Sequence, residues 1–138
     1  MRTLTSENLP ITLVVVLALS GCAPRDIKSV AGTYVAKYSF GTEKLSLQEN
    51  NWYRQELILA DGSTRYQNEG IWEWRCQKSL IILHNAMIVA DDNGKLSATF
   101  RDSRTAWILH IQNIPFLETS IPINEDLGLY FVKVKPKD

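Results

Sequence analysis

The segment "KLSLQENNWYRQELILADG", Lys44 to Gly62, holds the clearest strand and turn signals of the chain. In its opening, Lys44 to Gln48, polar and apolar residues alternate with period two, as in a strand with one buried face. Asn50-Asn51 follows, and asparagine tolerates the positive φ angles of a tight hairpin. Trp52 to Ala60 predicts the next strand, and Asp61-Gly62 predicts a second hairpin turn. Two strands bounded by such short turns predict an antiparallel meander.

The same pattern continues on both sides of this stretch. Between Leu80 and Gln112, the run Asp91-Asp92-Asn93-Gly94 predicts a further hairpin turn. After Cys22, no stretch shows a helical period of useful length. The expected additional strands are 30–39, 65–76, 80–89, 96–100, 105–112 and 127–135, and alternation in the second of these places Tyr66, Asn68, Gly70, Trp72 and Trp74 on one face.

One segment, Asn113 to Asp126, breaks this rhythm. Pro115 and Pro122 lack the N–H that a central strand must donate, so a central strand is not expected there. Its apolar residues predict instead that it packs over an open end of the sheet. The chain as a whole predicts an all-β fold, a single small antiparallel meander that forms an up-and-down β-barrel or a two-sheet sandwich. Closure would remove the exposed strand edges.

Composition limits the class of protein and of partner. The 138 residues are 45% hydrophobic and 22% charged, which is typical of one globular domain. The 15 Lys and Arg balance the 15 Asp and Glu. Such a balance gives no overall field that would attract a nucleic acid or an anionic membrane, so no nucleic-acid partner is expected.

The N-terminal segment carries the clearest motif. Leu9 to Leu19 is almost wholly apolar, and it is too short for a membrane span, which needs about 20 residues. It fits the apolar region of a secretory signal, which would form the expected N-terminal signal helix. Leu19-Ser20-Gly21-Cys22 follows and resembles the bacterial lipoprotein signal, in which Leu, a small residue, and Gly or Ala precede the Cys. A signal anchor or a buried strand that ends in Cys is the alternative.

The resemblance implies a defined chemistry at Cys22. A peptidase removes residues 1–21, and the Cys22 thiol carries a diacylglycerol as a thioether, which is the lipid attachment to the membrane. Ala23 stands where Asp would imply retention in the inner membrane, so the expected location is the cell envelope, at the periplasmic face of the outer membrane. Residues 22–29 form the lipidated cysteine and tether, residues 30–138 form the β-domain, and no other cofactor is expected.

The first half of the β-domain carries a second resemblance. Its motifs are Gly32-x-Tyr34, Leu45-x-Leu47, Asn51-x-Tyr53, Gly70-x-Trp72 and Ile81-Ile82-Leu83. Together they resemble the small lipocalin-like barrels of bacterial envelope lipoproteins, and are similar to the N-terminal domain of NlpE-like copper-resistance lipoproteins. The likeness covers about residues 32–83. The Cys-x-x-Cys of that family is missing from this chain, so no copper or redox role is carried over.

Aromatic residues are the candidate ligand-binding residues of the β-domain. A barrel interior lined by aromatic rings and a few polar groups could hold a small hydrophobic ligand. Alternatively, the rings simply fill the barrel, because eight strands leave an interior about wide enough for side chains alone. The six candidates are Tyr34, Tyr53, Tyr66, Trp72, Trp74 and Trp107.

The remaining candidates are His84, His110 and Cys76. The two histidines could meet across a sheet, but without a third ligand at a known spacing no metal site is expected. If Cys22 carries a lipid, Cys76 is either paired between chains or a buried thiol on a strand. The sequence therefore predicts a non-catalytic envelope lipoprotein that binds a protein or small ligand. The alternatives are a lipocalin-like carrier of a small hydrophobic ligand, and an enzyme that uses His84 or His110.

Overall fold

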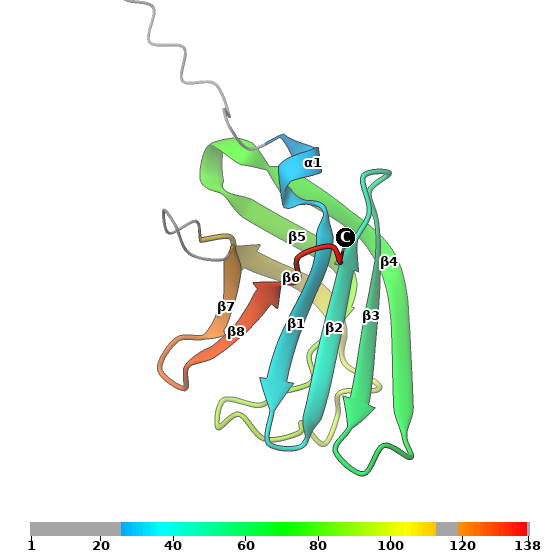
Figure 1. Cartoon of the computed structure of the whole chain (residues 1–138). Coiled ribbons are helices and arrows are strands. Elements are labelled where there is room, and N and C mark those ends of the chain that lie inside the picture. Colours follow the sequence, from blue (N-terminus) through cyan, green and yellow to red (C-terminus); the bar gives the residue numbers. More distant parts are fainter. Residues whose placement is uncertain (1–25, 113–118, 138) are drawn as a thin grey trace, which may run out of the picture.

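The computed structural model describes residues 26–112 and 119–137, and the regular structure within them is almost entirely β. Figure 1 shows the strands with a short helix, α1, at one end of the molecule. The elements are α1 (Ile27–Val30), β1 (Gly32–Tyr38), β2 (Gly41–Leu47), β3 (Trp52–Leu59), β4 (Arg65–Arg75), η1 (Cys76–Lys78), β5 (Leu80–Met87), β6 (Arg104–His110), β7 (Ser120–Asn124) and β8 (Leu129–Lys133).

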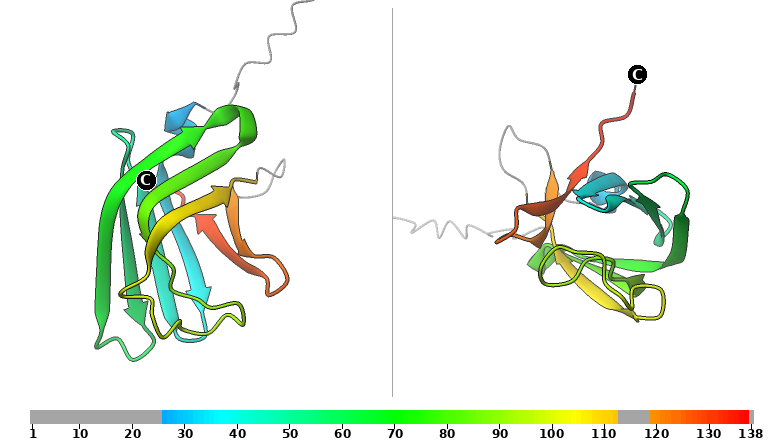
Figure 2. Two further views of the ribbon diagram at one scale, coloured as in Figure 1. Left: turned by 180° about the vertical axis from the view of Figure 1, so that it is seen from behind. Right: turned by 90° about the horizontal axis from the view of Figure 1, so that it is seen from below.

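The eight strands form one antiparallel sheet in the order β6-β5-β4-β3-β2-β1-β8-β7. Each strand from β1 to β5 pairs with the next along the chain, β1 also pairs with β8, and β8 pairs with β7. The view along the barrel in Figure 2 shows this sheet curling round an interior. Between β6 and β7 runs a seam that the isolated bridge Gln112–Ser120 spans. The predicted all-β meander is confirmed, as a nearly closed barrel-like sheet.

The turns form where the asparagine and glycine signals predict them. Asn51, Gly62 and Gly94 all have positive φ angles, of 68°, 69° and 72°. In the third turn, the Asp91 carboxylate accepts hydrogen bonds from the backbone N–H groups of Asn93 and Lys95, both at 2.9 Å. These local bonds hold the register between strands, because each turn fixes which residues face one another.

Two strand predictions are wrong in detail. Residues 96–100 form no ladder: Leu96 makes an isolated bridge to Ala90, and the chain then turns so that Phe100 is buried against Tyr66. The predicted loop after Asn113 contains a strand, β7. Its Pro122 is tolerated because β7 is the last strand of the sheet, and among the described residues the edge away from β8 makes a single bridge, from Ser120 to Gln112. Residues 113–118, predicted to pack over an open end, lie outside the described residues.

The interior follows the predicted alternation. In β6, Leu109 is buried with an exposed fraction of 2%, whereas its neighbour Ile108 is 57% exposed. At one end the interior is covered by α1, whose Val30 is buried. The Val30 carbonyl accepts a hydrogen bond of 2.6 Å from the Tyr34 hydroxyl. Residues 27–29, predicted as the end of a tether, thus belong to a helix that packs on the barrel.

Candidate functional site

A bulge in β5 organises the polar side chains of the interior. The pairing of β5 with β6 shifts register between Leu83 and Ala86, and Asn85 there has a φ of 58°. A bulge leaves backbone groups without ladder partners. Here the Tyr53 hydroxyl donates to the His84 carbonyl at 2.7 Å, and the Asn68 amide donates to the Asn85 carbonyl at 2.8 Å. Inward-facing side chains of β3 and β4 thus replace the missing ladder bonds.

Gln55 extends the same arrangement to Met87. Its side-chain amide donates to the Met87 carbonyl, and its side-chain oxygen accepts the Met87 N–H at 2.9 Å. The amide of Gln55 also donates to the carboxyl group of Glu43, which accepts a second hydrogen bond of 2.6 Å from Tyr38. These side chains come from β1, β2 and β3 and lie inside the barrel. The bonds from Gln55 to Met87 connect them to β5.

Glu43 is the buried ionisable group of this arrangement. Its exposed fraction is 0%, and burial raises the pKa of its carboxyl group to about 7, although the bonds from Gln55 and Tyr38 act in the opposite direction. Burial also raises the pKa of Tyr38. The described hydrogen-bond partners of Glu43 are neutral, so the side chain titrates near neutral pH without a cation to hold its charge.

The six candidate aromatic residues lie inward and pack within the core. Tyr34, Tyr53 and Trp72 have exposed fractions of 0–1% and belong to the main hydrophobic cluster. Trp74 and Trp107 pack against that cluster, and Tyr66 packs against a second cluster around Phe100. Two of the buried rings also make structural bonds, because Tyr34 binds α1 and the Trp72 indole donates to the Gln48 carbonyl at 2.8 Å. The rings therefore occupy space in the interior of the barrel.

The two histidines are not brought together. His110 faces Leu80 across the β5–β6 pair, four residues along the strand from His84. His84 instead contacts Glu73, with Nε2 and Oε1 2.7 Å apart, and Glu73 also binds Arg75. Among residues 26–112 and 119–137, no group of three or more His, Cys, Asp or Glu could hold a metal ion.

Neither cysteine lies on a described strand. Cys76 begins η1, directly after β4, and is partly exposed, so the predicted buried thiol on a strand is wrong. A tight turn replaces the strand there because Ser79 adopts a left-handed conformation. The structure records Cys76 as disulfide-bonded. Cys22, the predicted lipid attachment, lies outside the described residues.

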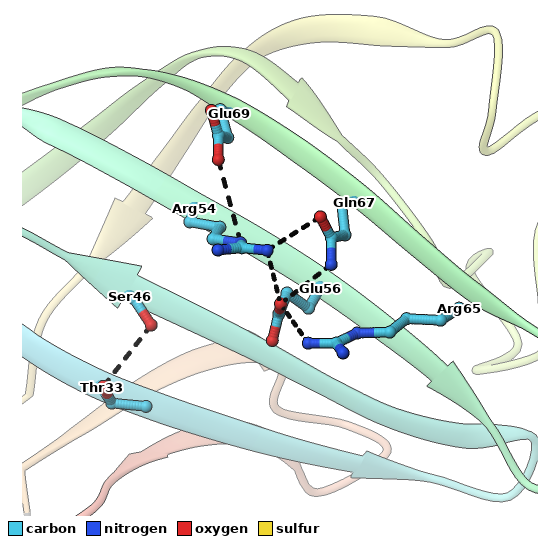
Figure 3. Close-up of polar contacts among 7 residues, drawn as sticks. All are labelled: Thr33, Ser46, Arg54, Glu56, Arg65, Gln67 and Glu69. Carbon is cyan, nitrogen blue, oxygen red and sulfur yellow. Dashed lines mark hydrogen bonds and ion pairs between the residues drawn. The ribbon is translucent and has the colours of Figure 1, made fainter. Parts of the chain in front are cut away.

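The outer face of β3 and β4 carries a ladder of paired charges (Figure 3). The Glu56 side chain is 8% exposed; its carboxylate forms an ion pair with Arg54, with Oε1 and Nη2 3.2 Å apart, and accepts a hydrogen bond from Arg65. Gln67 accepts from Arg54 at 2.8 Å, and Glu69 lies 3.9 Å from Arg54. Two arginines and two glutamates thus neutralise one another. We call these five residues the arginine–glutamate ladder.

The outer face of β1 and β8 is different, because lysines gather there without such partners. Two adjoining hollows share Val35, Lys133, Val134 and Lys135, and we call the combined surface the lysine groove. No acidic side chain is among the described residues that line it. The sequence has eight lysines, and six of them line this groove: Lys28, Lys37, Lys44, Lys133, Lys135 and Lys137.

Five of the six lysines are exposed, and Lys133 is the exception. Its Nζ donates to the Ser29 carbonyl at 2.7 Å and lies 5.7 Å from the centre of the Tyr34 ring. Partial burial lowers the pKa of Lys133. Lys133 therefore fastens α1 to β8, while the other five amines point to solvent and form no ion pair with a described residue.

Two acidic residues near the groove, Asp26 and Glu56, are already engaged. Asp26 caps α1 by accepting the Ser29 N–H at 2.9 Å. Glu56, which faces Lys44 across the β2–β3 pair, belongs to the arginine–glutamate ladder. Glu125 and Asp126 stand in the β7–β8 turn, just before Gly128 at one end of the groove. The groove is therefore a local positive surface on a chain with no net charge.

Comparison of the chain with protein-family models, curated proteins and solved structures found no match. No helix in the described part of the chain is long and apolar enough to cross a membrane.

Sequence reasoning missed both the interior bonds to the bulge and the lysine groove. A signal for the first was present, because Gln55 and Asn68 are polar at positions where alternation points inward. The groove joins residues about 100 positions apart, as the bond from Lys133 to Ser29 illustrates. Only the pairing of β1 with β8 brings its two halves together.

Proposed function

We propose that the chain is a bacterial envelope lipoprotein, anchored through a lipid on Cys22, whose barrel is a non-catalytic binding module. The observation that carries this proposal is Leu19-Ser20-Gly21-Cys22, directly after the apolar run Leu9 to Leu19. Two or more acyl chains give stable anchoring where a single chain does not. The proposal therefore assigns the chain a permanent place at a membrane surface.

The position of the barrel along the chain supports this assignment. The described domain begins at Asp26, four residues after Cys22. Four extended residues span at most about 14 Å. A lipid on Cys22 would therefore keep α1 and the barrel end that it covers close to the headgroups.

The distribution of side chains favours binding at the outer surface. The polar interior residues Gln55 and Asn68 are occupied with the bulge backbone, and Trp72 and Tyr34 fill the core beside them. The unpaired positive charges lie outside, in the lysine groove. These placements favour a surface interaction over a ligand carried inside the barrel.

The disulfide state of Cys76 defines the chemical alternative. A sulfur that carries a lipid thioether cannot also form a disulfide, and Cys22 is the one other cysteine of the sequence. Lipidation of Cys22 and a disulfide between Cys22 and Cys76 therefore exclude each other in the same molecule. The experiment must distinguish these two states.

The test is mass spectrometry of the protein from the membrane fraction of a bacterial host, with and without reduction. We expect an N-terminal peptide that begins at Cys22 and carries a diacylglycerol, with residues 1–21 missing. Cys22→Ser should abolish the lipid, and the matched control Cys76→Ser should leave it in place. A product that retains Met1, or a peptide pair linked through Cys22 and Cys76 that separates on reduction, would refute the proposal.

A further inference from the structure

We propose that the lysine groove binds the anionic phospholipid headgroups of a membrane, so that the outer face of β1 and β8 lies on the bilayer. This inference deepens the proposed function and takes the position of the anchor from it. The groove's affinity for such a surface is nevertheless a property of the folded barrel, and can be measured without the lipid on Cys22.

Unpaired charge is the first argument. Each described arginine of the ladder contacts a glutamate, as Arg54 and Arg65 do with Glu56, whereas the five exposed groove lysines form no such pair. Clustered like charges repel one another in the free protein. Basic residues next to a membrane gain free energy from its negative surface potential. An anionic surface would therefore relieve the repulsion within the groove.

The apolar floor of the groove is the second argument. Val132 and Val134 have exposed fractions of 36% and 48%, and Val35 and Tyr130 lie beside them. Lysine side chains can rest their aliphatic stems on such a floor while their amines reach outward. A surface that combines exposed valines with lysines matches the boundary between acyl chains and headgroups.

The place where the chain enters the domain is the third argument, and it favours a membrane over an acidic protein. Lys28 lies in α1, two residues after Asp26, and it lines the groove. Lys135 and Lys137, from the C-terminal segment after β8, line the same hollow as Lys28. Because Cys22 is about 14 Å or less from Asp26, an anchored chain would hold this end of the groove near the headgroups.

The experiment measures binding to vesicles by sedimentation. The mature chain, residues 22–138 with Cys22→Ser, carries no lipid, and circular dichroism verifies that it retains its β structure. We expect it to sediment with vesicles of phosphatidylcholine and phosphatidylglycerol but not with phosphatidylcholine alone. Binding should weaken as salt is raised, because exposed charges about 10 Å apart are screened at 0.1 M.

Variants identify the binding surface. Lys135→Gln should weaken vesicle binding about 5-fold, and Lys37→Gln in the same chain should bring the loss to about 25-fold, the range expected for single lysines at an anionic surface. Lys95→Gln is the matched control: Lys95 is exposed, but it stands in the loop before β6, outside the groove. Its effect should stay below about 2-fold.

Three results would overturn the inference. These are equal sedimentation with both vesicle types, an equal effect of Lys135→Gln and Lys95→Gln, and vesicle binding that is absent while soluble polyglutamate protects the groove lysines from acetylation. The last result would indicate an acidic protein as the partner. The outcome is separate from that of the lipid anchor, because a chain lipidated at Cys22 can lack the groove interaction, and an unlipidated chain can show it.

Discussion

The arginine–glutamate ladder and the lysine groove lie on the same curved sheet. They differ in whether their charged side chains form ion pairs. On β3 and β4, Glu56 forms ion pairs with Arg54 and Arg65, and Glu69 forms a longer one with Arg54. In the lysine groove, five lysines from α1, β1, β2 and the segment after β8 point to solvent without an ion pair to a described residue. The charges of the ladder pair with one another, although the buried Arg54 Nε has no hydrogen-bond partner, whereas the five exposed groove lysines pair with no described residue.

The two surfaces differ in what a substitution is expected to change. Removing one member of a closed network leaves its partners unsatisfied, which costs folding free energy. Removing a solvated, unpaired charge changes the folded state little and alters mainly what the surface attracts. We therefore expect substitutions in the ladder to lower stability, and substitutions of exposed groove lysines to change binding instead.

The largest effect on stability is expected at Glu43. Unlike the glutamates of the ladder, its carboxyl group bonds two neutral side chains and no described cation. Burial raises its pKa from 4.5 to about 7, so between these pH values the folded state retains a proton that the unfolded state has released. Stability should therefore fall by about 3 kcal/mol as pH rises through this window. Urea denaturation between pH 4 and 8, compared with Glu43→Gln, measures the difference. Identical pH slopes in the two proteins would contradict it.

The next effect is expected in the ladder itself. Glu56→Gln removes the carboxylate that Arg54 and Arg65 share, and should lower the free energy of unfolding by about 2 kcal/mol. Glu69→Gln is the matched control, because Glu69 is 62% exposed and 3.9 Å from Arg54. Its cost should stay below about 0.5 kcal/mol. Urea denaturation measures both free energies of unfolding. Equal decreases in the two variants would contradict the description of the ladder as a network centred on Glu56.

A smaller effect is expected at Lys133, the one groove lysine that has a structural bond. Lys133→Met keeps the aliphatic stem but removes the bond to the Ser29 carbonyl, at a cost of about 1 kcal/mol. Hydrogen exchange at the Ala31 N–H, which bonds the Ile27 carbonyl in α1, should become faster. Lys135→Met should leave this exchange unchanged. Unaltered exchange in Lys133→Met would show that α1 is held by other contacts.

The smallest effect on stability is expected where the effect on binding is largest. Lys37→Gln combined with Lys135→Gln should change the free energy of unfolding by less than about 0.5 kcal/mol, because both side chains are exposed and unpaired within the described structure. Urea denaturation tests this. A loss comparable to that of Glu56→Gln would mean that the groove lysines, like the ladder, are part of the folded framework.

The local elements of the fold could be predicted from the sequence because each depends on neighbouring residues. Alternation identified the inward face of β4, including Trp72, and the positive φ angles of Asn51 and Gly62 followed from residue type. Residues 96–100 have the alternation of a strand but form no ladder, since β6 occupies the place beside β5 and Phe100 is buried from a turn instead. Alternation predicts a buried face and not the presence of a pairing partner.

The groove and the bulge could not be predicted in this way, because both depend on strands that meet after folding. Balanced composition concealed the groove, since the total of 15 positive and 15 negative residues says nothing about how they are distributed. Lys28 and Lys135 become neighbours of one surface only through the β1–β8 pair. In the same way, Gln55 lies in β3, which does not pair with β5, and its side chain bonds Met87 of β5 only after folding.

The most direct test of the account is lysine acetylation of the lipidated protein in vesicles with and without phosphatidylglycerol, read by mass spectrometry. The groove interaction predicts that Lys37, Lys44 and Lys135 react severalfold more slowly in the anionic vesicles, while Lys95 reacts at the same rate in both. The same spectra report whether Cys22 carries its lipid. Equal rates for the groove lysines and Lys95 in both vesicle types, on a protein shown to be lipidated, would contradict the account.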